Sequence, residues 1–401
     1  MINLGDTELL TFFIIVYSLT IYIIAGMLML VKKGQPKQDY NLEPTVSVLM
    51  SCFNEGERVY RTIKSIAECE YPKHKLEIIA FDDCSTDDSW EWIQKAASEH
   101  DNVVAVKNKQ NQGKPDTMSD ASLLAKGDMI LGIDSDCEFN KNCIRELVSC
   151  FADEKVGAVG GRVGLINVND NMLTRWQSMI YLLGFKLIKT FESWHGAVQC
   201  LSGPMVMIKR DIYLKIMPEV KLSNFLGIRC SIGEDRHASQ VLLRHGYNNV
   251  YNDKAVCFTN VPNTWNQYLK QSIRWRKSAL GQWIDAFKNY KEYVINHSFI
   301  SLILSLFPVF IMVAWNVLIY GSLADGYILD IYEKLIMFYM ATSPIFIWFY
   351  IKSIDKREKM DSYLVFLLEG FFFSIYAPFS AVYITLFAMT TLDNTGWLSR
   401  N

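Results

Sequence analysis

The stretch MILGIDSD, residues Met129–Asp136, constrains the possible fold more than any other part of the chain. Its apolar first half is typical of a buried strand, and it ends in two carboxylates, Asp134 and Asp136. Residues two apart on a strand point to the same side, so both carboxylates can converge beyond the carboxyl end of a sheet. Paired carboxylate oxygens at that place suit Mg²⁺ or Mn²⁺ carrying a diphosphate. The competing interpretation is a turn with two solvated acids.

Apolar residues are unevenly distributed along the chain, which has 401 residues and is 50% hydrophobic. Four long apolar runs flank a more polar middle: Leu10–Val31, Phe299–Tyr320, Tyr332–Ile351 and Tyr363–Thr390. Each run alone could be a buried core helix, but four of them around a polar middle predict a multi-pass protein embedded in a lipid bilayer. The 42 acidic and 40 basic side chains nearly cancel, which argues against a nucleic-acid partner.

Charges beside the apolar runs predict the orientation in the membrane. The first run ends at Lys32 and Lys33, the segment 324–333 is acidic, and the segment 352–359 is basic. Because basic segments stay on the cytoplasmic side, we expect a plasma (inner) membrane protein whose polar middle is cytoplasmic. All nine cysteines lie between the first and second runs and form no C-x-x-C pair, which is typical of a reducing compartment without a zinc site.

Strands and helices are expected to alternate through the polar middle. Besides the strand that ends in D-S-D, buried strands are predicted at Val46–Cys52, Leu76–Phe81, Val103–Lys107 and Val156–Val163. Helices are expected between them, one of which begins at Ser85. This alternation predicts an α/β fold with a mostly parallel, doubly wound, Rossmann-like sheet.

The distribution of apolar and polar segments also predicts the domain organisation. We expect a transmembrane anchor at residues 1–33 and a polar, proline-containing linker at 34–44. A cytoplasmic domain at 45–290 would follow, ending in an interfacial amphipathic helix at 280–287, and residues 291–401 would return to the membrane. The apolar and aromatic stretch 173–191 is expected either at the membrane interface or on the sheet.

Polar residues follow several of the predicted strands. Asn54 follows the first strand, Asp83 follows the second, and Asp134 and Asp136 end a later one. Because the carboxyl ends of parallel strands meet at one edge, this pattern favours nucleotide recognition. The chain has neither a GxGxxG nor a Walker A loop, so a diphosphate would depend on a metal and on basic side chains. Lys114 is a candidate for that role, and a solvated loop lysine is the alternative.

A pair of acids in the motif SIGEDRH provides a candidate general base. Glu234 and Asp235 are adjacent there and precede Arg236. A fixed cation beside two carboxylates could keep one of them ionised and ready to accept a proton. Acids are also common in the first turn of a helix, which is the alternative.

The motif QSIRWRK is predicted to lie on a helix. Gln271, Arg274 and Trp275 are spaced so that they share one helix face. Arginine suits a phosphate group, and an indole suits the apolar face of a sugar ring. A basic helix at a membrane surface is the alternative.

Seven motifs in one order resemble those of the processive family 2 glycosyltransferases, in particular hyaluronan synthases and rhizobial chitin-oligosaccharide synthases. They are SCFNEGE, FDDCSTDD, NQGK, DSD, CLSGP, SIGEDRH and QSIRW. The resemblance covers about Thr45–Phe287 and extends loosely to the membrane segments. The single N-terminal apolar run and the ending LDNTGWLSR look more like the chitin-oligosaccharide synthases, whereas FLGIRCSIG and CLSGP look more like streptococcal hyaluronan synthases.

The resemblance implies a role for each matching residue. Donor recognition would use Asn54 and Asp83 for uridine, Lys114 for the nucleotide sugar, Arg274 near the pyrophosphate, and Asp134 and Asp136 for the diphosphate through Mn²⁺ or Mg²⁺. Asp235 would be the general base, with Glu234 beside it in the catalytic motif. The acceptor would lie against Ser202, Gly203, Pro204, Gln271 and Trp275.

The implied activity is an inverting transfer from UDP-sugar donors to a growing polysaccharide that leaves through a membrane channel formed by residues 291–401. UDP-GlcNAc would be used alone or in alternation with UDP-GlcA. Two alternatives are a transferase that adds one sugar to a lipid carrier and a catalytically silent membrane conduit; the intact acids and QSIRW argue against both. Glu369, in the last apolar run, would be a transport residue or a capped glutamate that faces the protein.

Overall fold

The computed structural model describes residues 36–221, 224–225, 228–229, 233–306, 326, 333, 347–348 and 350–391. The first apolar run lies outside the described residues, as do most of the second and third runs and the last ten residues of the chain. None of the helices in the described part of the chain is both long and apolar enough to span a membrane.

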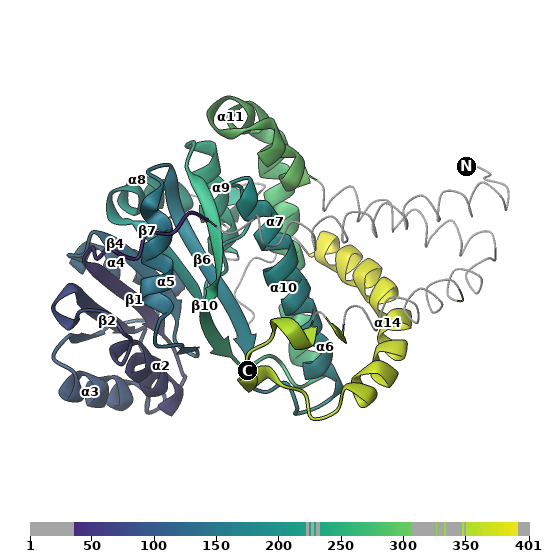
Figure 1. Cartoon of the computed structure of the whole chain (residues 1–401), viewed down its shortest axis with the longest axis horizontal. Helices are drawn as coiled ribbons and strands as arrows, with labels where there is room; N and C mark the ends of the chain where they lie inside the picture. Colours follow the sequence, from purple (N-terminus) through teal and green to yellow (C-terminus); the bar gives the residue numbers. More distant parts are fainter. Residues whose placement is uncertain are drawn as a thin grey trace.

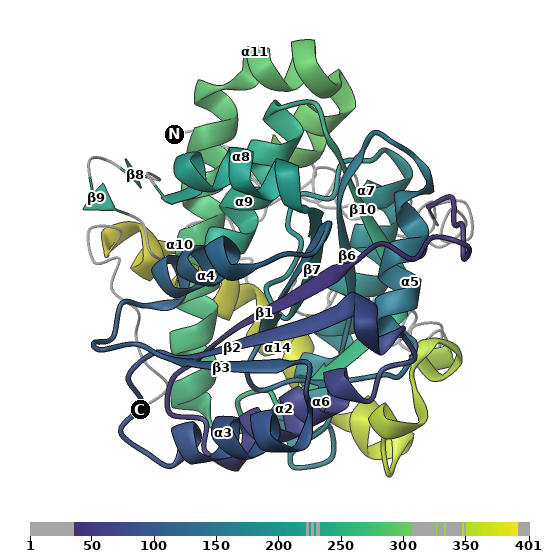
Figure 2. The same cartoon turned by 90° about the vertical axis from the view of Figure 1, so that its left-hand side faces the viewer.

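The middle of the chain forms an eight-stranded mixed sheet with the strand order β3-β2-β1-β4-β7-β6-β10-β5 (Figures 1 and 2). Its strands are β1 (Val46–Cys52), β2 (Leu76–Asp82), β3 (Val103–Lys107), β4 (Met129–Asp134), β5 (Glu138–Phe139), β6 (Val156–Leu165), β7 (Met205–Lys209) and β10 (Asn248–Thr259). A separate two-stranded sheet pairs β8 (Asn224–Phe225) with β9 (Ile228–Arg229).

Strand direction follows the predicted doubly wound pattern over half of the sheet. Strands β3, β2, β1 and β4 are parallel to one another, and β10 is parallel to β6. Strand β7 is antiparallel to both β4 and β6, and β5 is antiparallel to β10, so the sheet is mixed. Strand β7 is reversed because the chain enters it from the edge at which β4 ends, through the loop 200–204.

Helices cover both faces of the sheet, as Figure 2 shows. One face packs against α2 (Glu57–Ala67), α3 (Ser89–Glu99) and α5 (Cys143–Ser149), and the other packs against α4 (Lys114–Leu124), α8 (Arg210–Lys221) and α9 (Glu234–Arg244). Strand side chains alternate between the two cores: Val48 and Met50 of β1 enter the first core, whereas Leu49 enters the second. Burial of both faces explains why these strands are almost wholly apolar.

The helix expected from Ser85 begins instead at Ser89. Cys84 has a positive φ of 65°, and the four residues after it form a turn that contacts the loop after β1. Asn54 accepts a hydrogen bond from the backbone N of Thr86 at 2.9 Å, while its own backbone N donates to Ser85 Oγ at 3.0 Å. These contacts with Asn54 compete with helix formation, so the loops after β1 and β2 are joined at the sheet edge.

The remaining helical segments are spread over the rest of the structure, and the larger ones are labelled in Figure 1. They are α6 (Met172–Tyr181), α7 (Lys189–Trp194), α10 (Trp265–Lys288), α11 (Tyr290–Glu292) and α14 (Tyr363–Thr390), with π-helical turns at Leu182–Ile188 and Tyr293–His297 and 3₁₀ turns at Lys73–Lys75, Cys150–Ala152 and Lys356–Glu358. Helix α7 packs on the sheet, since the backbone N of Tyr251 donates to Ser193 Oγ at 2.9 Å. The segment 280–287 is not a separate helix but the last part of α10.

Two ion pairs attach the C-terminal segment to the sheet domain. Arg162 of β6 and Glu358 are both buried, at 6% exposure each, and form a salt bridge. Arg175 of α6 holds Glu369 of α14 through two contacts, of which the one between Nε and Oε2 is 2.7 Å. Glu369 therefore faces the protein, and a transport role for it stays a prediction.

We expect Glu358→Gln to lower the free energy of unfolding by about 3 kcal/mol, because it leaves the guanidinium of Arg162 buried without its counter-charge. Denaturant unfolding of the purified chain measures the change. The matched control is Glu57→Gln, which removes an exposed pair with Arg61 and should cost less than about 1 kcal/mol. The double variant Arg162→Met/Glu358→Gln should lose less than Glu358→Gln alone; an equal or larger loss would contradict this account.

Candidate active site

The antiparallel pairing of β4 and β7 brings the D-S-D motif beside the loop 200–204. Asp134 is the last residue of β4, and Ile133 pairs with Met205, the first residue of β7. Residues that follow β4 therefore lie beside residues that precede β7. A Cβ placed on Gly203 would lie 3.7 and 3.8 Å from the carboxylate oxygens of Asp134 and 3.2 Å from Lys114 Nζ. The sheet thus brings together three of the residues predicted from sequence.

Lys114 is the first residue of α4 and forms ion pairs with two predicted site residues. Its ammonium contacts Asp134 Oδ1 and lies 3.8 Å from Glu234 Oε1. Burial, the largest single effect, lowers the pKa of Lys114, but attraction to Asp134 and Glu234 outweighs it and the pKa is raised. Burial raises the pKa of Glu234 although Lys114 opposes that shift. Lys114 is therefore a fixed positive charge between two carboxylates, not a solvated loop lysine.

The first turn of α9 presents Glu234 and Asp235 to this lysine and to the loop. Gly233 precedes the helix with a φ of 79°, and a Cβ there would lie 1.9 Å from Ser278 Oγ of α10, so glycine is required both for the turn and for helix packing. Asp235 Oδ2 accepts a hydrogen bond from the backbone N of Gly203 at 3.1 Å. Asp235 is therefore attached to the loop that lies beside Asp134.

Arg236 does not supply the cation expected beside the two acids. Its guanidinium donates to Gln282 Oε1 of α10, and its backbone N donates to Asp235 Oδ1 at 2.8 Å. The positive charge that contacts Glu234 is Lys114, which comes from a different helix. Spacing in the sequence could not reveal this exchange, because the two residues meet only after the sheet has formed.

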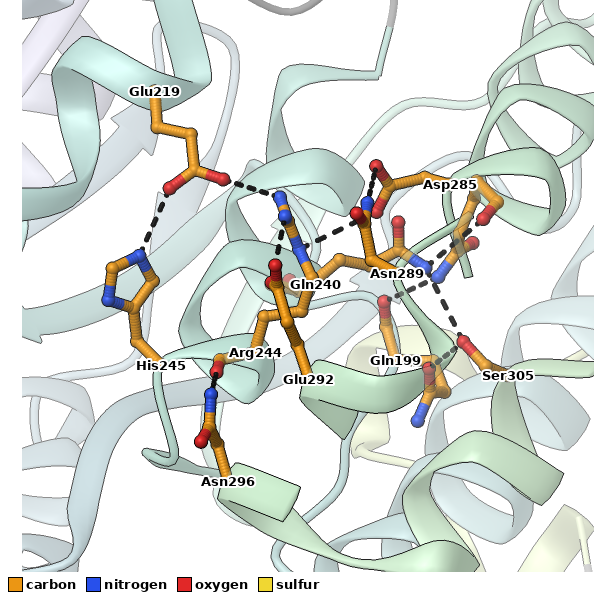
Figure 3. Close-up of polar contacts among 12 residues, drawn as sticks. Gln199, Glu219, Gln240, Arg244, His245, Asp285, Asn289, Glu292, Asn296 and Ser305 are labelled. Carbon is orange, nitrogen blue, oxygen red and sulfur yellow. Dashed lines mark hydrogen bonds and ion pairs between the residues drawn. The ribbon is translucent and has the colours of Figure 1, made fainter. Parts of the chain in front are cut away.

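The other end of α9 is held by Arg244, as Figure 3 shows. Its guanidinium forms ion pairs with Glu219 of α8 at 2.6 Å, Glu292 of α11 at 3.3 Å and Asp285 of α10 at 3.6 Å. His245 Nε2 lies 3.0 Å from the second carboxylate oxygen of Glu219. The helix that carries Asp235 is thus fixed at both ends to its neighbours.

Asp83 shapes the loop that leads to Lys114. Its side chain is buried, and its two oxygens accept hydrogen bonds from Asn108 Nδ2 at 2.8 Å, from the backbone N of Gln112 at 3.0 Å and from the backbone N of Gly113 at 2.8 Å. A carboxylate offers about four acceptor positions, so most of its capacity is used within the protein. Its predicted contact with a uridine remains a prediction.

The donor atoms present fit a divalent metal that a diphosphate helps to bind. The described residues contain no group of three or more His, Cys, Asp or Glu side chains suited to a metal ion. The protein would therefore supply the carboxylates of Asp134 and Asp136. Mg²⁺ and Mn²⁺ accept such a set, since they take hard oxygen ligands and are commonly held by one or two carboxylates together with substrate phosphates and water.

The predicted helix face, with Gln271, Arg274 and Trp275, lies in the first half of α10. Gln271 and Arg274 line a pocket of about 360 Å³. The lining residues in the described part of the chain do not include the carboxylates near Lys114. Trp275 is 43% exposed, and its ring centroid lies 6.1 Å from that of Tyr181 of α6. Gln271 and Arg274 therefore share one pocket, and Trp275 is exposed on the same helix.

Sequence reasoning missed two charged residues behind the loop 200–204. Lys189 donates to Ser202 Oγ, and Glu192 Oε2 accepts from the backbone N of Gln199 at 3.2 Å. Both side chains are nearly fully buried, and burial lowers the pKa of Lys189 and raises the pKa of Glu192 to about 7. The available signal was a lysine within the apolar stretch 173–191, with a glutamate one helical turn later.

The pKa of Glu192 makes stability depend on pH. Unfolding returns the carboxyl from about 7 toward its ordinary value of 4.5, so the folded chain binds the proton more tightly and loses stability as pH rises through that interval. We expect Glu192→Gln to remove this loss. The unfolding free energy of the variant minus that of the parent should be lowest near pH 5 and should be higher by roughly 3 kcal/mol above pH 7. Unfolding free energies across that range test this, and a difference that does not vary with pH would contradict it.

The mixed α/β sheet, with Lys114 held between Asp134 and Glu234 at the edge where β4 ends, has the arrangement of an α/β domain that binds a phosphate-bearing ligand. Residues 47–217 match the family described as Glycosyl transferase family 2, and this part of the chain belongs to that family. The predicted enzyme class and family resemblance are thereby confirmed for this domain.

Relatives named for two related activities are similar to the chain. An N-acetylglucosaminyltransferase from Mesorhizobium japonicum is 31% identical over 249 residues, 61% of this chain and 58% of the relative. A hyaluronan synthase from Streptococcus pyogenes is 28% identical over 374 residues, 92% of this chain and 85% of the relative. The chain thus spans less than two thirds of the rhizobial relative.

The fold is shared with a solved structure of a mannosyltransferase from Pyrobaculum calidifontis in complex with GDP-Man and Mn²⁺. The TM-score is 0.56 and the sequence identity is 16%, with 94% of this chain and 99% of the mannosyltransferase chain covered.

Proposed function

We propose that the protein is an inverting, processive glycosyltransferase that polymerises UDP-GlcNAc with UDP-GlcA into a β-linked polysaccharide and secretes it across the membrane. The observation that carries the proposal is the contact between Asp235 and Gly203, whose loop lies against Lys114 and Asp134. A proton acceptor and a site for a diphosphate are therefore adjacent. The similarity to the streptococcal hyaluronan synthase, which extends over 92% of the chain, supports the choice of donors.

The chain's own residues account for each chemical requirement of such a transfer. Asp235 takes the proton of the acceptor hydroxyl, and the hydrogen bond from Gly203 fixes the orientation of its carboxylate. The hydroxyl attacks C1 from the face opposite the leaving UDP, so one displacement inverts the anomeric centre. Lys114, beside Asp134, stabilises the negative charge that develops on the UDP, and the family resemblance assigns Arg274 a place near the same pyrophosphate. A bound Mn²⁺ or Mg²⁺ at Asp134 and Asp136 would supply further neutralisation of the diphosphate.

Exposed apolar side chains support a bilayer as a partner. Phe287, Ile295 and Phe299 are 60, 78 and 62% exposed at the end of α10 and just beyond it, and Leu364 and Leu368 of α14 are 68 and 62% exposed. These exposed side chains lie in or beside the second and fourth apolar runs of the sequence, which supports a membrane-facing surface there. Together with the apolar runs of the sequence, it favours a multi-pass protein of the plasma membrane whose catalytic domain is cytoplasmic and whose residues 291–401 form the polymer channel.

A second candidate function is the synthesis of chitin or chitin oligosaccharides from UDP-GlcNAc alone. The 31% identity to the rhizobial N-acetylglucosaminyltransferase favours it. A silent conduit is the weakest alternative, because it would have no need for Lys114 held between Asp134 and Glu234.

The donor requirement distinguishes the two candidates. Purified protein with Mn²⁺ would receive UDP-GlcNAc and UDP-GlcA separately and together, and both UDP release and product size would be measured. Long polymer made only with both donors supports the hyaluronan-type activity. Product from UDP-GlcNAc alone supports the chitin-type activity, and an absence of turnover with the two donors both separately and together would refute both candidates.

The role of Asp235 is tested by Asp235→Asn, which removes the proton acceptor but keeps the shape of the side chain. We expect transfer to fall by about 10²- to 10⁴-fold while UDP binding is retained, since the diphosphate site is unchanged. Calorimetry measures UDP binding, and UDP release measures turnover. Asp101→Asn, on an exposed turn, is the matched control and should be fully active. Undiminished polymer output by Asp235→Asn would rule out this mechanism.

A further inference from the structure

Lys189 is a buried cation that the proposed chemistry does not use. It lies on α7 at 8% exposure, and its ammonium is 3.9 Å from the centroid of the Phe185 ring. No carboxylate in the described part of the chain lies within 4.0 Å of it. A buried charge without an ion-pair partner is costly, so a compensating contact or a function is expected. The ammonium makes one such contact, a hydrogen bond to Ser202 Oγ.

The direction of that hydrogen bond follows from the chemistry of the two groups. An ammonium has donors and no acceptor, so Ser202 Oγ must accept, and the single hydroxyl proton of Ser202 remains to be donated elsewhere. A hydroxyl that accepts from a charged donor is also polarised and becomes a stronger donor itself. Lys189 thus determines the direction in which the Ser202 hydroxyl donates and increases its strength as a hydrogen-bond donor.

The backbone on both sides of Ser202 is fixed by α9. The backbone N of Leu201 donates to Ser239 Oγ at 2.8 Å, and the backbone N of Gly203 donates to Asp235 Oδ2 at 3.1 Å. The residues on both sides of Ser202 are therefore hydrogen-bonded to the helix that carries Asp235. Its hydroxyl belongs to the loop that presents Gly203 to Lys114 and Asp134.

We propose that Lys189 is a positioning residue for the acceptor: through Ser202 it directs one hydrogen-bond donor to an uncharged oxygen of the acceptor sugar, beside the hydroxyl that Asp235 deprotonates. This inference rests on the proposed function and adds to it a residue that holds the acceptor. The Ser202 hydroxyl aligns the acceptor with the base, and Lys189 acts only through that hydroxyl. Without this alignment, water competes with the acceptor for the donor sugar.

The test is a double-mutant cycle on the full-length protein with Lys189→Met, Ser202→Ala and the double variant. Methionine fills the volume of the lysine without its charge. With UDP-GlcNAc as donor and chitobiose as acceptor, we expect each single change to raise the KM for chitobiose by about tenfold, the effect of one lost hydrogen bond. The double variant should be no worse than either single one, because both remove the same bond. The fraction of UDP-GlcNAc hydrolysed instead of transferred should rise in all three.

Controls separate this role from a structural one. Lys186→Met changes a lysine of the same segment that pairs with Asp253, and its KM for chitobiose should stay within about twofold of the parent. Ser202→Thr keeps the hydroxyl and should retain transfer, which provides a test even if Lys189→Met does not fold. UDP affinity should be unchanged in every folded variant, because the donor site is intact.

The inference would be overturned if the double variant raised the KM for chitobiose by the product of the two single effects. It would also be overturned if Ser202→Ala kept the parent's KM and the parent's ratio of hydrolysis to transfer. If the parent protein binds UDP but transfers no sugar with any donor, the proposed function itself is refuted. If the parent is active and these variants leave its activity unchanged, only the role of Lys189 is refuted.

Discussion

The reversed strand β7 is the constraint on which the site depends. Because β7 runs antiparallel to β4, the end of one strand lies beside the start of the other, and Gly203 reaches the carboxylate of Asp134. In a sheet with β7 parallel, the loop 200–204 would lie at the opposite edge, far from the polar residues that follow β1, β2 and β4. The hydrogen bond from Gly203 then attaches Asp235 to the same place.

Electrostatics at this edge are dominated by one lysine among several acids. Lys114 stays protonated because Asp134 and Glu234 outweigh the cost of its burial. Without it, two carboxylates would face each other at the end of the sheet. The positive charge of Lys114 also suits a leaving diphosphate. The residue that separates the two carboxylates when no substrate is bound would therefore also stabilise the negative charge of the leaving group.

Sequence reasoning predicted the strands and site segments that carry local signals. Apolar runs located β1, β2, β3 and β4, and D-S-D marked the end of β4. The sequence prediction placed the start of α3 too early, because Asn54 hydrogen-bonds to the turn before that helix. It also named Arg236 as the cation beside the acids, whereas Lys114 from another helix contacts Glu234. Neither contact can be read from residue spacing. Lys189 was missed for the same reason: its partner Ser202 is a neighbour only once α7 has packed on β10.

The attachment of α9 to α10 has a consequence for how a polymer could advance. Ser278 lies against Gly233, Gln282 accepts from Arg236, and Arg244 pairs with Asp285, so the two helices are joined along their length. Asp235 is therefore carried by a helix that is attached to the second half of α10, the helix that also carries Trp275. In a processive cycle of the proposed kind, a base held by these contacts would stay in place while the product advances past it.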